Sequence, residues 1–118
     1  MSAADFVVTI HALERMEERF PAIADERTDE EVGVFIQSEV NDALEAGRYG
    51  STVPIELAPH GADSWRQRNP GAYGVWDREK TRGYIVVEDP DEGMVVLTVL
   101  VGEEREYAMR KLRRLERK

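Results

Sequence analysis

Apolar and polar positions follow helical spacing in the first half of the chain and strand spacing in the second half. Between positions 10 and 20, the apolar residues recur every three or four positions: Ala12, Leu13, Met16 and Phe20. This spacing predicts a first helix over roughly His11 to Phe20, with Thr9 as its N-cap. Pro21 ends it, because the residue before a proline resists helical geometry. The preceding run, residues 5–10, is β-like and leads into this helix.

A second helix is predicted from a capping box. In Thr28-Asp29-Glu30-Glu31, the threonine hydroxyl accepts from the backbone N–H of Glu31, whose carboxylate reaches back to the N–H of residue 28. Apolar residues then follow helical spacing: Val32, Phe35, Ile36, Val40, Ala43 and Leu44. Gly47 suits the position just after the helix. The carboxylates of residues 25–31 serve capping and solvation, since acids are favoured at a helix start.

After Gly50 the pattern becomes that of strands. Three runs are predicted as strands: Tyr73 to Asp77, Gly83 to Asp89, and the continuously apolar Met94 to Val101, which suits a central strand. A weaker run from Ser51 to Leu57 contains Pro54, which places it at a sheet edge. Residues 58–71 are rich in turn formers and make the longest irregular loop, a place where functional residues often lie.

These elements predict an α+β domain over residues 1–102. Its two N-terminal helices pack on a three- to four-stranded antiparallel sheet. Residues 103–118 are predicted as a basic C-terminal helix.

Charge and composition narrow the classes of function. The net charge is −8, with 13 acidic and 4 basic residues before residue 61, but 4 acidic and 7 basic ones after residue 102. The acidic body disfavours unspecific nucleic-acid binding, whereas a local cationic patch is still effective, because salt screens charges beyond about 8 Å. The chain has no cysteine, no apolar run of bilayer length and no basic start of a signal peptide. We therefore expect a cytoplasmic protein with no membrane association.

One stripe of the first helix carries candidate chemistry. His11, Arg15 and Arg19 recur at every fourth residue, which aligns them along one side of a helix with 3.6 residues per turn. Imidazole titrates near neutral pH, and guanidinium groups bind phosphate bidentately. This stripe therefore suits chemistry on phosphates, and it equally suits a solvated helix edge.

The helix also resembles a known family. Ile10, His11, Ala12, Arg15, Met16 and Arg19 form an Ile-His-Ala-x-x-Arg-Met-x-x-Arg motif, and Val96 to Leu100 form an apolar strand at the end of a meander. Together they resemble small uncharacterised domains close to the RelE/ParE toxins, within the barnase–EndoU–colicin–RelE ribonuclease-like fold, over roughly residues 9–102. The resemblance implies metal-independent RNA cleavage, or a descendant that kept the fold without the activity.

Metal-independent RNA cleavage requires a base, an acid and cations that stabilise the phosphorane charge. The predicted catalytic residues are His11, Arg15, Arg19, Thr98 and Tyr84, with Arg82 completing the cleft. In the alternative reading, His11 packs at a helix start, Arg15 pairs with Glu18, and Thr98 satisfies a hydrogen bond in the core.

Two basic segments are candidate nucleic-acid contacts. Trp65, Arg66 and Arg68 combine an aromatic ring with cations, a pairing that suits base stacking and phosphate contact. The alternative places the tryptophan under the sheet edge and the arginines in solvent. The tail residues Arg110, Arg113 and Arg114 either contact RNA phosphates or fold back on the acidic second helix.

No cofactor and no metal site are predicted: His11 and His60 are the only histidines, and no zinc motif is present. Two functions follow. The first is a toxin-like RNA-binding or metal-independent endoribonuclease domain of bacterial or phage origin, with RNA and an antitoxin as partners. The second is a non-catalytic interaction protein that modulates a host protein through its acidic surface and basic tail.

Overall fold

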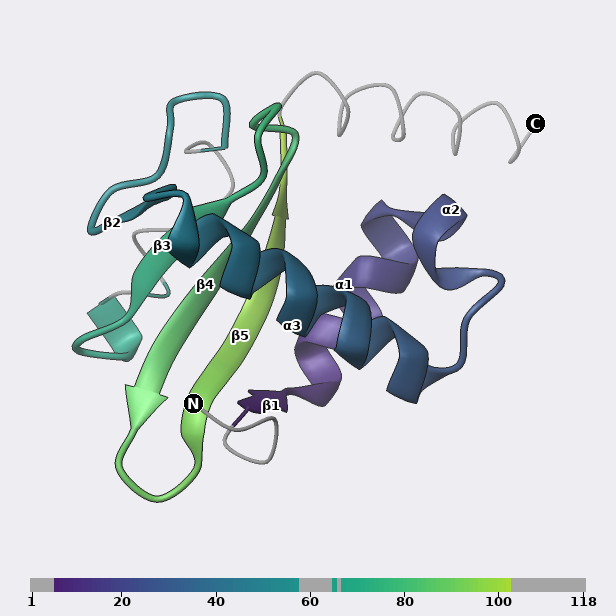
Figure 1. The fold of residues 1–118 in the computed structure, drawn as a ribbon, viewed down its shortest axis with the longest axis horizontal. Coiled ribbons are helices and arrows are strands. Elements are labelled where there is room, and N and C mark those ends of the chain that lie inside the picture. Colours follow the sequence, from purple (N-terminus) through teal and green to yellow (C-terminus); the bar gives the residue numbers. More distant parts are fainter. Residues whose placement is uncertain (1–5, 58–64, 66, 103–118) are drawn as a thin grey trace.

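The computed structural model describes residues 6–57, 65 and 67–102. The elements are, in chain order, β1 (Phe6–Val8), α1 (Ile10–Arg19), α2 (Pro21–Ala24), α3 (Asp29–Glu45), β2 (Tyr49–Gly50), β3 (Tyr73–Trp76), β4 (Arg82–Asp89) and β5 (Gly93–Val101). The domain is α+β, and Figure 1 shows α3 crossing one face of the sheet. The predicted helix over residues 103–118 lies outside the described residues.

The sheet is mixed, so the expectation of a purely antiparallel sheet is wrong. Its order is β1-β5-β4-β3-β2, and β1 runs parallel to β5 with Phe6 opposite Met94 and Val8 opposite Val96. The other neighbouring strands are antiparallel. The β-like run before the first helix forms this additional edge strand, and everything between β1 and β5 supplies the long connection that parallel pairing needs.

The expected edge strand from Ser51 to Leu57 is also wrong. The strand beside β3 is β2, which pairs Tyr49 with Val75 and is only two residues long. Pro54 has no N–H to give to a strand ladder. Its carbonyl instead accepts from the Leu57 N–H at 2.9 Å, which closes a turn and buries Leu57 completely.

The predicted helix caps are confirmed, and α1 begins and ends one residue earlier than predicted. The Thr9 hydroxyl accepts from the Ala12 N–H, and Thr28 and Glu31 form both bonds of the capping box. At the end of α3, Gly47 takes a φ of 76°, and the Arg48 N–H donates to the Ala43 carbonyl at 2.8 Å. This Schellman motif ends the helix where a glycine is favoured. The short helix α2, which begins at Pro21, was not predicted from the sequence.

The core has two parts, one on each face of the sheet. On the helix side, α1 and α3 bury Met16, Ile36 and Val40 against the strands. On the other face, Leu57, Ala72, Ile85 and Leu100 form a smaller cluster, with Trp65 packed against it.

A bulge in β5 determines which residues point to each face. Ile85 lies opposite Thr98 and Val86 lies opposite Val96, so Leu97 is an extra residue in the ladder. The residues on the helix side are Met94, Val96, Val99 and Val101. Without the bulge, strict alternation from Val96 would turn Thr98 toward the helices. With it, Thr98 lies on the same face as Ile85.

Candidate functional site

A pocket of about 400 Å³ lies where α1 meets the outer edge of β5, and we refer to it as the His11 pocket. It is lined by His11, Arg15, Arg19, Trp65, Arg68, Thr98 and Leu100. The structure thus brings together the three residues of the α1 stripe, the predicted strand residue Thr98, and two of the three predicted loop residues. Arg66 lies outside the described residues.

The position of α1 follows from the short length of β1. After Val8, the strand gives way to Thr9, whose N–H donates to the Val96 carbonyl at 3.2 Å. Further along, Arg19 Nη1 donates to the Val99 carbonyl at 2.6 Å. The helix therefore covers the part of the β5 edge that β1 leaves unpaired, and this holds the stripe beside Thr98.

Trp65 forms one wall of the pocket. Its ring centroid lies 5.1 Å from that of His11, with the two rings tilted by 47°. The guanidinium carbon of Arg68 lies 4.6 Å from the Trp65 ring centroid, within the range of a cation–π contact. The tryptophan thus packs against the core cluster and also fixes a histidine and an arginine at the pocket.

Arg15 is paired, as the alternative reading of the helix expected. Its Nη1 lies 2.6 Å from Glu18 Oε2, and the two side chains are 34% and 42% exposed. An ion pair this exposed contributes little stability, on the order of 0.2–1 kcal/mol. A phosphate can therefore compete with Glu18 for this guanidinium at small cost.

The histidine is neutral near neutral pH. Burial of the imidazole, followed by the Arg15 guanidinium, lowers the pKa of His11 below its ordinary value of 6.5, although Glu14 acts in the opposite direction. Arg19 and Arg68 lower the pKa further. His11 is therefore a proton acceptor in a pocket whose described lining contains three guanidinium groups and no carboxylate.

Thr98 is nearly inaccessible, with 2% of its surface exposed. It lines the pocket, and among the described residues its hydroxyl has no hydrogen-bond partner. A buried hydroxyl without a partner costs free energy. The Thr98 hydroxyl is therefore a candidate hydrogen-bond donor to a ligand oxygen bound in the pocket.

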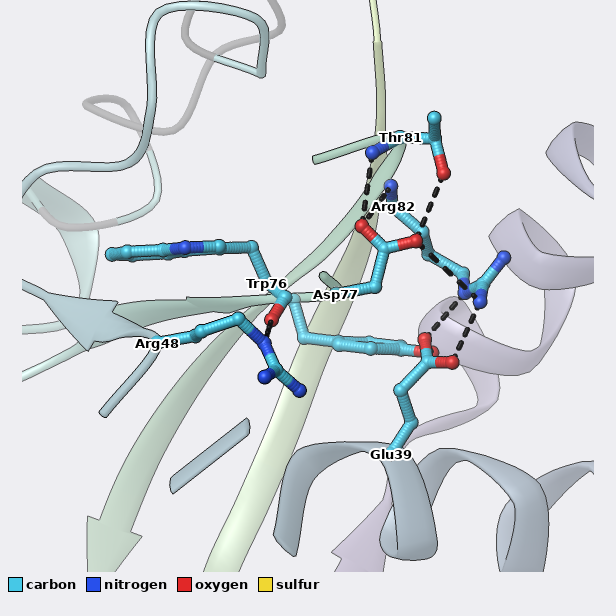
Figure 2. Close-up of polar contacts among 7 residues, drawn as sticks. Glu39, Arg48, Trp76, Asp77, Thr81 and Arg82 are labelled. Carbon is cyan, nitrogen blue, oxygen red and sulfur yellow. Dashed lines mark hydrogen bonds and ion pairs between the residues drawn. The ribbon is translucent and has the colours of Figure 1, made fainter. Parts of the chain in front are cut away.

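Tyr84 and Arg82 are not part of this pocket. They lie on the helix face, where Arg82 Nη2 donates to Glu39 at 2.6 Å (Figure 2). The Tyr84 hydroxyl also donates to Glu39 at 2.6 Å. Burial and then the Glu39 carboxylate hold the pKa of Tyr84 well above its ordinary value. The predicted contribution of these two residues to the cleft fails because alternation along β4 points them away from Thr98.

A larger hollow of about 570 Å³ lies beyond the end of α3. Tyr49, Tyr73 and Glu88 are among its lining residues, and the described lining includes one carboxylate and no lysine, arginine or histidine. Burial and then Glu88 raise the pKa of Tyr73 to about 12. This hollow does not suit an anion, and a third pocket that contains Arg48, Arg78 and Arg82 is also lined by four carboxylates. The described lining of the His11 pocket combines cations with no carboxylate, so it is the candidate phosphate site.

The predicted nucleic-acid contacts of the C-terminal tail cannot be placed in the structure. Arg110, Arg113 and Arg114 of the tail lie outside the described residues. Within the described part of the chain, no group of three or more histidines and carboxylates is placed to hold a metal ion. No helix in that part is both long and apolar enough to cross a membrane. Leu100, which lines the pocket beside Thr98, was missed, because its apolar side chain reads as an ordinary core residue.

Comparisons of the chain with protein-family models, curated proteins and solved structures find no match. The likeness to RelE/ParE-type domains therefore stays an expectation from the sequence motif.

Proposed function

We propose that this protein binds single-stranded RNA at the His11 pocket and cleaves it without a metal ion. One observation carries the proposal: a histidine with a lowered pKa and three arginines line the same pocket, whose described lining contains no acidic residue. Cations gathered around one neutral base supply two of the three groups that phosphodiester cleavage requires in the absence of a metal, and water can supply the third, the acid. The sequence resemblance points to the same reaction.

The proposed chemistry uses the groups that line the pocket. Neutral His11 takes the proton of a ribose 2′-hydroxyl, and the 2′-oxygen attacks the adjacent phosphorus. The bond from phosphorus to the 5′-oxygen breaks, and the leaving oxygen takes a proton from water. The products are a 2′,3′-cyclic phosphate and a 5′-hydroxyl. Arg15, Arg19 and Arg68 offset the charge that develops on the phosphoryl oxygens.

A second candidate, a non-catalytic protein that binds a host protein, is favoured by the ion pair between Arg15 and Glu18. That pair neutralises one cation of the stripe, and the net charge of −8 opposes approach of RNA at long range. The cleavage experiment below separates the two functions.

The proposal is tested with a labelled single-stranded RNA in EDTA. We expect cleavage to persist without divalent metal and to stop when the RNA carries 2′-O-methyl groups, because the nucleophile is then blocked. Arg15→Ala should lower kcat/KM by about 10- to 100-fold, since it removes one phosphate donor. Arg78→Ala is the matched control, because Arg78 is exposed and lies outside the pocket. Absence of cleavage by the wild-type protein would favour the interaction protein.

The pH dependence of cleavage is expected to follow deprotonation of His11. Only neutral imidazole accepts a proton, and the pKa of His11 in the free protein lies below 6.5, so kcat/KM should rise with pH and level off near neutral pH. KM should also rise with pH, because a protonated imidazole at low pH adds a charge that attracts phosphate. Steady-state kinetics between about pH 5 and 8 measure both. A kcat/KM that falls as the pH rises through this range would contradict a role of His11 as base.

A further inference from the structure

Thr9 connects the two sides of the His11 pocket through one hydroxyl group. Its Oγ1 accepts from the Ala12 N–H at 3.1 Å, which caps α1, and donates to the Leu97 carbonyl at 3.2 Å. His11 follows two residues after Thr9, and Thr98 follows directly after Leu97. The same side chain therefore holds the start of the helix that carries the base and the bulge that carries the buried hydroxyl.

The bulge needs this bond because regular pairing ends before it. The register between β1 and β5 stops at Val8 and Val96, and the Thr9 N–H takes the Val96 carbonyl. The Leu97 carbonyl belongs to the extra residue of the ladder, so the Thr9 side chain occupies the place of a backbone donor there. The bulge is what turns Thr98 toward the pocket.

We propose that Thr9 is a positioning residue that fixes His11 relative to Thr98 across the pocket. This inference rests on the proposed function, in which His11 is the base and the pocket that Thr98 also lines holds the substrate. A hydroxyl is needed at this position because it accepts from the Ala12 N–H and donates to the Leu97 carbonyl at the same time. Serine can replace it, whereas valine provides neither bond. Glycine is tolerated as an N-cap and has no donor for the Leu97 carbonyl.

Thr28 provides the matched control. It caps α3 in the same way, accepting from the Glu31 N–H at 3.2 Å, and among the described residues it gives no hydrogen bond to the sheet. Thr28→Val therefore removes a comparable cap without touching the pocket. Both variants lose a cap, and Thr9→Val should lower the melting temperature further because it also loses the bond to Leu97. An effect at the pocket that is absent in Thr28→Val therefore does not come from loss of a helix cap alone.

The test is an NMR titration of His11 in the wild type, Thr9→Val, Thr9→Gly, Thr9→Ser and Thr28→Val, repeated with inorganic phosphate as the probe. In Thr9→Val and Thr9→Gly, we expect the pKa of His11 to rise toward 6.5 as the pocket loosens. Phosphate affinity should fall by about tenfold. Thr9→Ser and Thr28→Val should behave like the wild type. Thr9→Gly keeps the test valid if the valine variant does not fold.

The outcomes separate this inference from the proposed function. If the pKa of His11 and the phosphate affinity stay unchanged in Thr9→Gly, the role of Thr9 is overturned while the pocket still binds phosphate. If the pKa of His11 rises in that variant but wild-type protein has no affinity for phosphate, Thr9 positions the helix and the proposed function fails. A change of equal size in Thr28→Val would reduce Thr9 to an ordinary cap.

Discussion

Replacing Glu39 with alanine is expected to lower the free energy of unfolding by about 3 kcal/mol, the largest stability effect that we predict. Glu39 comes from α3 and accepts hydrogen bonds from Arg82 (Figure 2) and from Tyr84, both on β4. Arg82 is only 15% exposed, and Tyr84 is fully buried. Removing the carboxylate leaves the buried phenol without its partner and leaves the guanidinium with only the longer ion pair to Asp77, at 3.7 Å, so much of the cost of their desolvation stays uncompensated.

Urea denaturation followed by circular dichroism measures this effect. Glu39→Gln should cost less, because its amide oxygen still accepts from one of the two donors. Glu79→Ala is the control, since Glu79 is exposed near the same network and should change stability by about 0.5 kcal/mol or less. Equal stability of Glu39→Ala and Glu79→Ala would show that the network does not hold α3 to the sheet.

Replacing His11 with alanine is expected to reduce kcat for RNA cleavage by about 100- to 10,000-fold, the largest effect on activity that we predict. His11 is the one group of the pocket's described lining that titrates near neutral pH. The imidazole packs against Trp65, so the alanine variant has a space of the size of an imidazole ring beside Trp65.

Free imidazole provides a control for the chemical role of this residue. If His11 is the base, imidazole in solution should restore part of the activity of His11→Ala and leave Arg15→Ala unchanged. The melting temperature of His11→Ala should stay close to that of the wild-type protein, because His11 is only partly buried and is not part of either core cluster. Full activity in the alanine variant would place the base elsewhere.

The sequence predicts the local parts of the fold well. Thr9, the capping box at Thr28 and the C-terminal Gly47 depend on hydrogen bonds within a few residues, so the helix ends can be read from neighbouring residues. The strands from residue 73 onward coincide with apolar runs, which can also be recognised from neighbouring residues alone. These predictions need no knowledge of distant contacts.

The sheet topology depends on distant contacts and could not be predicted in the same way. Phe6 to Val8 form a strand because β5 provides a parallel partner almost ninety residues later. The bulge at Leu97 has no signature in an apolar run, yet it determines that Thr98 faces the pocket. The sequence predicts Thr98 in the cleft from its position in the strand, whereas in the structure the bulge turns its side chain toward the pocket.

Candidate site residues on α1 were easier to find than those on strands. The spacing of His11, Arg15 and Arg19 fixes their common side on any helix. Tyr84 and Arg82 show the opposite case, because their face depends on the register of β4 with β5 and on the partner that α3 provides. Glu39 is that partner, and on the sequence it is one acid among many on a helix surface.

The central claim, that the His11 pocket binds RNA, is tested most directly by NMR titration of the wild-type protein with a short single-stranded RNA at low ionic strength. We predict shifts of the His11 ring, the Trp65 indole and the Thr98 methyl at the same RNA concentrations, weakened in Arg15→Ala and unchanged in Arg78→Ala. Shifts confined to Tyr49 and Tyr73 around the other hollow, or no shifts at any concentration, would contradict the claim.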